Sequence, residues 1–423
     1  MTSLFWCAEV RMARTVFVMG ETRDKVKNEL ARGSAISIVA LVNFLIEEAG
    51  LMHASDIHIV PEEKNTRVRY RIDGILEDKH TYPNSLNQSV ISRIKVLAGV
   101  RTDEHQAAQD GRFTINLDGV IMDIRVSIVP TYHGENAVLR ILSDKAENFS
   151  LEALGFSDGD RRKILKAIKK PFGMILSTGP TGSGKTTTLY TIIRLLNSRE
   201  SSIVTIEDPI EYSIGGITQI QVNSRSGLTF ANGLRSILRQ DPNVIMVGEI
   251  RDVETASIAV NTSLTGHLLL STLHTTDAAT TLPRLLDMKI EPFLVASTVN
   301  VAIGQRLLRR ICKTCRKERA MTSAEKDSLT ESLPESLSAS INSMWHGTGC
   351  DECNKTGYKG RVGINEVMLV DQEIREAILL KSSAKEIKRI AVKNGMTTML
   401  EDGIEKAKQG VTTIEEVLRV IHE

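Results

Sequence analysis

The sequence is poor in the features that mark membrane proteins and nucleic-acid-binding proteins. No apolar run among its 423 residues approaches the 18 or more that a membrane-spanning helix needs. Aromatic residues make up 4% and the formal net charge is +1, which indicates neither a base-stacking channel nor a basic surface for a polyanion. The N-terminus lacks the uninterrupted apolar segment of a signal peptide. We therefore expect a cytoplasmic protein that does not bind nucleic acid.

Cysteine is also scarce, and four of the five cysteines are grouped in two pairs. Cys312 and Cys315 form one C-x-x-C pair, and Cys350 and Cys353 form a second. Two such pairs are a strong zinc signal, and a set of free buried cysteines is the alternative. Because the pairs lie far apart, the helix-like segment between them is expected to form a small excursion that the metal holds at its base.

One glycine-rich segment organises the rest of the chain. Residues 179–186 match the phosphate-loop pattern G-x-x-x-x-G-K-[ST] at every position, between an apolar strand at 174–176 and a segment of helical spacing. Lys185 should reach the β and γ oxygens, and the Thr186 hydroxyl is placed for Mg²⁺. The predicted nucleotide-binding residues are Gly179, Pro180, Thr181, Gly182, Ser183, Gly184, Lys185, Thr186 and Thr187.

The periodicity of the chain predicts two domains. Alternating strands and two helices before the phosphate loop indicate a small α+β domain, and short apolar strands that alternate with helices after it indicate a parallel α/β sheet. A stretch without periodicity between them reads as a linker that acts as a hinge. We predict an unassigned segment at 1–33, the small domain at 34–142, the hinge at 143–157 and the nucleotide-binding domain at 158–423, which includes a zinc module at 312–353 and C-terminal helices at 371–423.

Acidic residues follow two of the predicted parallel strands. Glu207 and Glu211 belong to a group of carboxylates after the second strand, and Glu249 follows the third. Ligands of α/β sheets bind at the carboxyl ends of strands, so these groups are candidates for holding a metal and orienting water. His267 and His274 flank the fourth strand, and at least one is a candidate sensor of the γ-phosphate. Each acidic group alone is also typical of a solvated loop.

The order of motifs ASDIHI, RYRIDG, QDGR, GPTGSGKTTTLY, TIEDPIE, VGEIRD and TGHLLLSTLHTTDA resembles the ATPases that drive type II secretion and type IV pilus assembly. The resemblance runs from about residue 36 to the C-terminus. It implies a RecA-like ATPase domain preceded by a small PAS-like domain, with ATP bound between them. It also implies a hexameric ring, peripheral to the cytoplasmic membrane, that moves an inner-membrane platform protein.

The resemblance also assigns catalytic roles. It implies Glu211 as general base with Glu207 beside it, Glu249 as the Walker B carboxylate, His274 as the γ-phosphate contact with His267 as its companion, and Arg125 and Arg140 as the arginines that close onto ATP.

The four-cysteine insertion distinguishes the motors of the resembled family. It accompanies assembly and secretion motors and is absent from retraction motors, so we favour assembly or secretion. A retraction ATPase, a nucleic-acid translocase on the same core and a non-hydrolysing scaffold are the alternatives. Two departures stand out: residues 105–108 replace a usual Leu-Pro before QDGR, and the residues before Ser34 are too few for the further N-terminal domain usual in the family.

Overall fold

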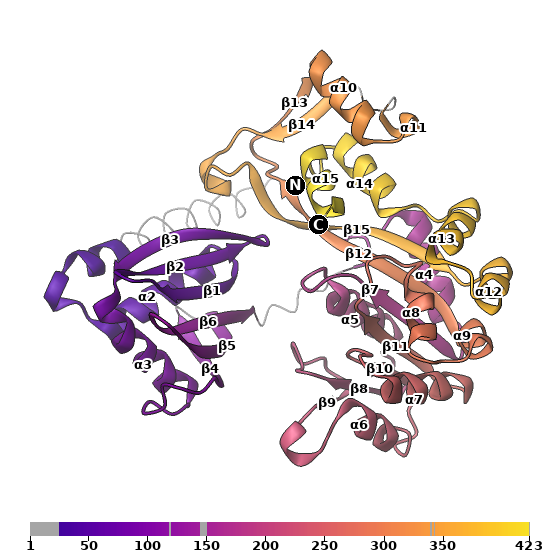
Figure 1. Cartoon of the computed structure of the whole chain (residues 1–423), viewed down its shortest axis with the longest axis horizontal. Helices are drawn as coiled ribbons and strands as arrows, with labels where there is room; N and C mark the ends of the chain where they lie inside the picture. Colours follow the sequence, from indigo (N-terminus) through magenta and orange to yellow (C-terminus); the bar gives the residue numbers. More distant parts are fainter. Residues whose placement is uncertain (1–24, 118–119, 144–149, 339–340, 342, 423) are drawn as a thin grey trace. The chain divides into compact units, whose positions relative to one another are not determined.

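The computed structural model describes residues 25–117, 120–143, 150–338, 341 and 343–422. The chain divides at residue 146 into two compact units, coloured indigo to purple and magenta to yellow in Figure 1. This division falls inside the linker predicted over 143–157. However, Leu151 and Phe156 are buried in the core of the second unit, because their apolar side chains pack there despite the lack of periodicity. The second folded unit thus begins before residue 158.

The first unit is a six-stranded antiparallel sheet with the order β3-β2-β1-β6-β5-β4. Its elements are η1 (Gly33–Ala35), α2 (Ile38–Leu51), β1 (Ala54–Pro61), β2 (Asn65–Ile72), β3 (Ile75–Pro83), η2 (Asn84–Leu86), α3 (Asn87–Ala98), β4 (Gln109–Leu117), β5 (Val120–Thr131) and β6 (Gly134–Ser143). Helices α2 and α3 contribute Leu41, Leu45 and Ile91 to the core beneath the sheet. Val26 joins this core as well, so the folded unit extends N-terminal to Ser34.

The small α+β architecture follows the sequence pattern closely, with one omission. Strand β3 was not predicted, because Glu77, Asp78 and Lys79 interrupt the alternation of apolar and polar residues. It is an edge strand, so its charged side chains reach solvent without loss of pairing to β2.

The second unit is built on a seven-stranded sheet with the order β15-β12-β7-β11-β10-β8-β9. Its sheet strands are β7 (Gly173–Thr178), β8 (Ile203–Glu207), β9 (Thr218–Gln221), β10 (Val244–Val247), β11 (Leu268–Leu273), β12 (Val299–Ile311) and β15 (Tyr358–Leu369). Neighbouring strands are parallel except for β15, which pairs antiparallel with β12. Its helices are α4 (Asp158–Ile168), α5 (Lys185–Leu196), η3 (Ser224–Ser226), α6 (Phe230–Ile237), α7 (Val253–Leu264), α8 (Thr281–Asp287), α9 (Pro292–Thr298), α12 (Gln372–Leu379), α13 (Ala384–Lys393), α14 (Met399–Lys408) and α15 (Ile414–His422).

Both faces of this sheet are covered. Successive residues of β7 enter different cores: Met174 and Leu176 pack with residues of α6 to α9, whereas Ile175 packs with residues of α4 and α5. A strand buried on both faces needs apolar residues at every position, which explains its continuous apolar run. The predicted α/β class is confirmed.

The cysteine module leaves the sheet at the end of β12. It comprises β13 (Arg316–Ala320), α10 (Ser323–Ser332), α11 (Glu335–Ser338), β14 (Ser343–Gly347) and η4 (Asp351–Cys353). Leu329 and Met344 pack against Ile404 and Val417 of the C-terminal helices, so the module is fixed to the second unit by apolar contacts. No helix within the described ranges combines the length and the apolar character required to cross a membrane.

Candidate active site

The phosphate-loop segment joins β7 to α5. Gly179, Gly182 and Gly184 have φ values of 144°, 78° and 91°, a backbone region that favours glycine. A Cβ on Gly179 would also lie 2.3 Å from the carbonyl oxygen of Gln305. The loop can therefore curve tightly only with glycine at these positions. All nine predicted nucleotide-binding residues lie in this loop and the first turn of α5, where backbone N–H groups and the helix N-terminus favour anions.

Lys185 is held inside the curve of the loop. Its Nζ donates hydrogen bonds to the carbonyl oxygens of Gly179 at 2.8 Å and Pro180 at 2.9 Å. Burial lowers the pKa of this ammonium group, and the nearby charge of Glu249 opposes that shift. The Ser183 hydroxyl is buried without a hydrogen-bond partner in the described part of the chain. A cation and an unsatisfied polar atom beside the loop's backbone suit a polyphosphate.

Glu249 and His274 lie at the same edge of the sheet as this loop. In the register of the parallel strands, Leu273 lies beside Thr178, so β11 ends where the loop begins. Directly after β11, the His274 Nε2 lies 3.1 Å from Glu249 Oε2. The Arg251 Nε lies 2.7 Å from the same oxygen. A cavity of about 270 Å³ opens here, lined by Ile250, Arg251, Leu273, His274, Arg284 and Met288.

Glu207 and Glu211 of the TIEDPIE segment differ in their surroundings. Glu207 is buried and accepts hydrogen bonds from the Tyr190 hydroxyl, from Thr205 Oγ1 at 2.6 Å and from Gln219 Nε2 at 3.2 Å. Glu211 is half-buried, and its backbone N–H donates to the Tyr190 oxygen at 3.4 Å. Burial, followed by the charge of Glu207, raises the pKa of Tyr190 and keeps its hydroxyl a donor. Tyr190 thus connects the phosphate-loop helix with the Glu207 carboxylate and with the backbone of Glu211.

The four cysteines of the two pairs come together. Their sulfur atoms all lie within 4.8 Å of one another, and the pairs 312–350, 315–353 and 350–353 are 3.8, 3.8 and 3.7 Å apart. A tetrahedral zinc with Zn–S bonds of about 2.3 Å places its sulfurs about 3.8 Å apart. Burial raises the pKa of Cys353, but N–H groups of Cys350 and Gly357 directed at its sulfur lower it to about 7. The cluster fits a four-coordinate metal.

The predicted arginines lie in the first unit, on the sheet face opposite its helices. Arg125 of β5 and Arg140 of β6 are directly opposite each other in register. Arg140 Nε donates to Asp56 Oδ1 at 2.9 Å, while 58% of the Arg140 side chain is exposed. Arg112 of β4 continues the row beside Arg125. Arg112, which belongs to the QDGR motif and pairs with Asp123, was not among the predicted site residues.

The chain matches the family described as type II/IV secretion system protein over residues 31–419. It belongs to this family. "Type II secretion system protein E" of Aeromonas hydrophila is 43% identical over 407 residues, which are 96% of this chain and 80% of that protein. "Type IV pilus assembly ATPase PilB" of Thermus thermophilus is 46% identical over 413 residues, which are 97% of this chain and 46% of that protein.

Two solved structures resemble this secretion-system protein. The pilus retraction motor PilT with bound ADP is 27% identical with a TM-score of 0.59, and the match covers 89% of this chain and 95% of that one. The ATPase DotB of Legionella pneumophila shares the fold with a TM-score of 0.64 at 24% identity, over 89% of this chain and 93% of that one. This secretion-system protein is an ATPase.

The structure does not bring His267 of the ATPase to the phosphate loop. His267 precedes β11, whereas His274 follows it, so the two imidazoles belong to opposite ends of one strand. The Nδ1 of His267 lies 3.1 Å from the carbonyl oxygen of Thr262, and its own carbonyl accepts the N–H of Gly173, the first residue of β7. Both strands run parallel, so this end is remote from Thr178. A role for His267 as companion of His274 within one protomer is therefore not supported by this geometry.

Proposed function

We propose that this ATPase is a hexameric motor that powers type IV pilus assembly or type II secretion by moving an inner-membrane platform protein. The observation that carries the proposal is that the phosphate loop, Glu249 and His274 lie at one edge of the parallel sheet. Relatives at 43% and 46% identity are named for these two machines. We place the motor in the cytoplasm, attached to the inner face of the membrane through its partners.

Two observations favour assembly or secretion over retraction. The four-cysteine cluster is present, and the resembled assembly and secretion motors carry such an insertion whereas retraction motors do not. The neighbouring retraction motor is also only 27% identical, well below the two relatives above. A nucleic-acid translocase is disfavoured by a net charge of +1 and 4% aromatic residues.

The proposed chemistry is hydrolysis of ATP by a positioned water molecule. Lys185 and the loop N–H groups bind the phosphates, and Thr186 would hold a magnesium ion, which neutralises charge on the phosphate oxygens. Glu211 accepts the proton of the attacking water, and Glu249 would hold the metal or a water bound to it. His274, within hydrogen-bond distance of Glu249, contacts the γ-phosphate.

Within this scheme, Glu211 suits the base better than Glu207. Glu207 already accepts three hydrogen bonds in a buried site, so its carboxylate has little capacity left for water. We assign it a positioning role, in which it orients the Tyr190 hydroxyl to receive the N–H of Glu211.

We predict one structural zinc per protomer, held by Cys312, Cys315, Cys350 and Cys353, because all four positions of a tetrahedral site are filled by protein. Metal analysis of the purified protein should find it. Cys350→Ser should release the zinc and lower the melting temperature, because a fixed ligand set is lost. Cys7→Ser, which changes the fifth cysteine, should do neither. A fully folded protein without zinc would contradict the assignment.

The motor function is tested by what stimulates ATP turnover. We expect the purified protein to hydrolyse ATP faster when the cytoplasmic domain of a pilus or secretion platform protein is added, because that domain is its mechanical load. Single-stranded and double-stranded DNA should leave the rate unchanged. Lys185→Ala, measured alongside, gives the background rate. Stimulation by DNA without any response to the platform domain would replace the proposal with the translocase.

A further inference from the structure

The loop of residues 274–280 connects the phosphate-loop edge with the C-terminal helices. Its first residue is His274, and its second, Thr275, is bonded to Thr178, which directly precedes the phosphate loop. The Thr275 N–H donates to Thr178 Oγ1 at 3.0 Å, and that hydroxyl lies 2.9 Å from the Thr275 carbonyl oxygen. One end of this loop is therefore attached to the strand that positions the phosphates.

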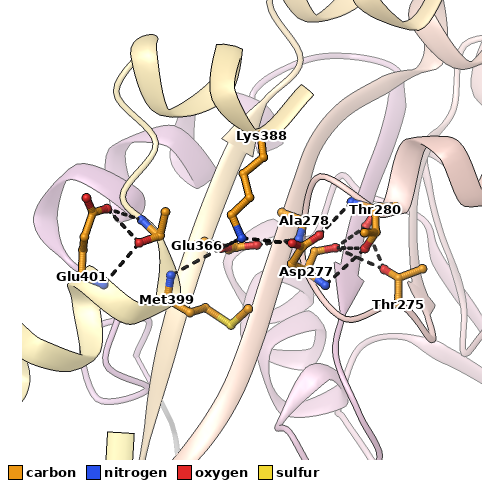
Figure 2. Close-up of polar contacts among 10 residues, drawn as sticks. Thr275, Asp277, Ala278, Thr280, Glu366, Lys388, Met399 and Glu401 are labelled. Carbon is orange, nitrogen blue, oxygen red and sulfur yellow. Dashed lines mark hydrogen bonds and ion pairs between the residues drawn. The ribbon is translucent and has the colours of Figure 1, made fainter. Parts of the chain in front are cut away.

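The other end of the loop is held by two charged side chains from distant parts of the chain. Asp277 Oδ2 lies 3.0 Å from Lys388 Nζ of α13, and the N–H of Ala278 donates to Glu366 Oε1 of β15 at 2.7 Å. Figure 2 shows Lys388 reaching between the two carboxylates. The second Glu366 oxygen accepts the N–H of Met399, the first residue of α14, at 3.4 Å. The loop is thus bonded directly to β15 and α13, and through Glu366 to α14.

Glu366 has little freedom to move away. Its side chain is fully buried, and a Cβ on the neighbouring Gly304 would lie 2.9 Å from its Cγ and 3.0 Å from the N of Ala278. Lys388 Nζ lies 3.9 Å from Glu366 Oε2 and 3.0 Å from Asp277 Oδ2, so its charge faces both carboxylates. Burial raises the pKa of Glu366, although the charge of Lys388 opposes this. Buried charged groups of this kind add little net stability, because burying the charges costs about as much as pairing them gains. Loss of one partner, however, leaves the others unpaired, so the group holds its members in a fixed geometry.

We propose that Lys388 and Glu366 are positioning residues for ATP turnover: they fix the loop of residues 274–280, and with it His274, beside the phosphate loop. This inference rests on the proposed role of His274. It also makes α13 and α14 part of the nucleotide response, because a bonded path leads from Thr178 through the loop to both helices. By thermodynamic reciprocity, nucleotide at the phosphate loop and the arrangement of these helices influence each other.

The first test compares two lysines of the same helix. Lys388→Met keeps the length of the side chain and removes its charge, so Asp277 loses its partner and the loop shifts. We expect kcat for ATP to fall about tenfold or more, since small displacements of catalytic groups have large effects, while KM changes much less. Lys393→Met, which removes an exposed pair of α13 with Glu373, should retain wild-type turnover. Lys388→Arg, which restores the charge, should recover most of the loss.

Two more variants examine the same contacts. Asp277→Asn should lower kcat by a similar factor, and Asp277→Asn combined with Lys388→Met should be no worse than either alone, because they break one interaction. If Lys388→Met folds poorly, Asp277→Asn provides the same test in its place. Glu366→Gln should reduce turnover too, since an amide offers one oxygen where the carboxylate accepts two N–H groups.

Hydrogen–deuterium exchange separates positioning from general loss of structure. In Lys388→Met the amides of residues 275–280 should exchange faster, while those of α5 stay protected. A non-hydrolysable ATP analogue should slow exchange in α13 and α14 of the wild type and lose that effect in the variant. The proposal would be overturned if the turnover of Lys388→Met lay within about twofold of that of Lys393→Met. It would also be overturned if Lys388→Met lost turnover while hydrogen exchange in residues 275–280 stayed unchanged. If the wild type itself lacked ATP turnover, the proposed function would fail, and loop exchange alone would still decide this inference.

Discussion

Glu211→Gln is expected to bind ATP as the wild type does. Its rate of ATP hydrolysis should fall by about a hundredfold or more, since an amide cannot accept the proton of the attacking water. Lys185→Ala should instead lose both tight binding and turnover, because it removes the cation held at the loop carbonyls of Gly179 and Pro180. Filter or gel-filtration assays of retained nucleotide distinguish the two variants. Glu211→Gln should retain bound ATP, and Lys185→Ala should retain none.

The control for Glu211→Gln is the same substitution at a glutamate whose ion pair lies on the surface. Glu254→Gln removes a charge from the start of α7, where Glu254 pairs with Arg235 at 2.7 Å, and should leave turnover unchanged. If Glu211→Gln kept most of its activity, the base assignment would be wrong and Glu207 would become the candidate. Tyr190→Phe refines the result, because loss of the hydroxyl that bonds both the Glu207 carboxylate and the backbone N–H of Glu211 should lower kcat without preventing ATP binding.

Arg140→Ala is expected to bind ATP and to lose turnover by about a thousandfold or more, the size of effect that arginine fingers contribute. Arg140 is largely exposed and held extended by Asp56, and Arg125 lies opposite it on the next strand. We propose that the hinge predicted over residues 143–157 closes so that both guanidinium groups reach the γ-phosphate of the same protomer. This closure would be the power stroke. Arg69→Ala, which removes an arginine paired with exposed Asp78 on the same sheet, should leave turnover intact.

A mixing experiment decides whether the arginines act within a protomer or across subunits. Lys185→Ala and Arg140→Ala protomers are combined under conditions in which the oligomer re-forms. If the arginines served a neighbouring subunit, some interfaces would pair an intact phosphate loop with an intact arginine and ATP turnover would return. Under closure within one protomer no site is complete, so the mixture stays inactive. Recovered activity would rule out the hinge mechanism.

The fold class could be predicted from the sequence wherever short-range periodicity defined an element. Strands β7, β8, β10 and β11 and the caps of the C-terminal helices are examples, such as Ser383, whose hydroxyl accepts the N–H of Glu386. Strands β12 and β15 were not predicted. They form the longest pairing in the sheet, and polar residues such as Gln305 and Asn365 break their apolar pattern. Gln305 Oε1 accepts from Thr188 Oγ1 at 2.7 Å, a partner 117 residues away that the sequence of the strand does not reveal.

The sequence by itself determined the phosphate loop and the two cysteine pairs, because the chemistry of each depends on residues a few positions apart. Only the tertiary structure decided that the Glu207 carboxylate already accepts three hydrogen bonds, that His274 lies beside Glu249, and that His267 lies at the far end of β11. It also placed Lys388 against Asp277, 111 residues away. Spacing along the chain fixes local turns and helices, but contacts between distant residues depend on strand order and packing, which no single segment contains.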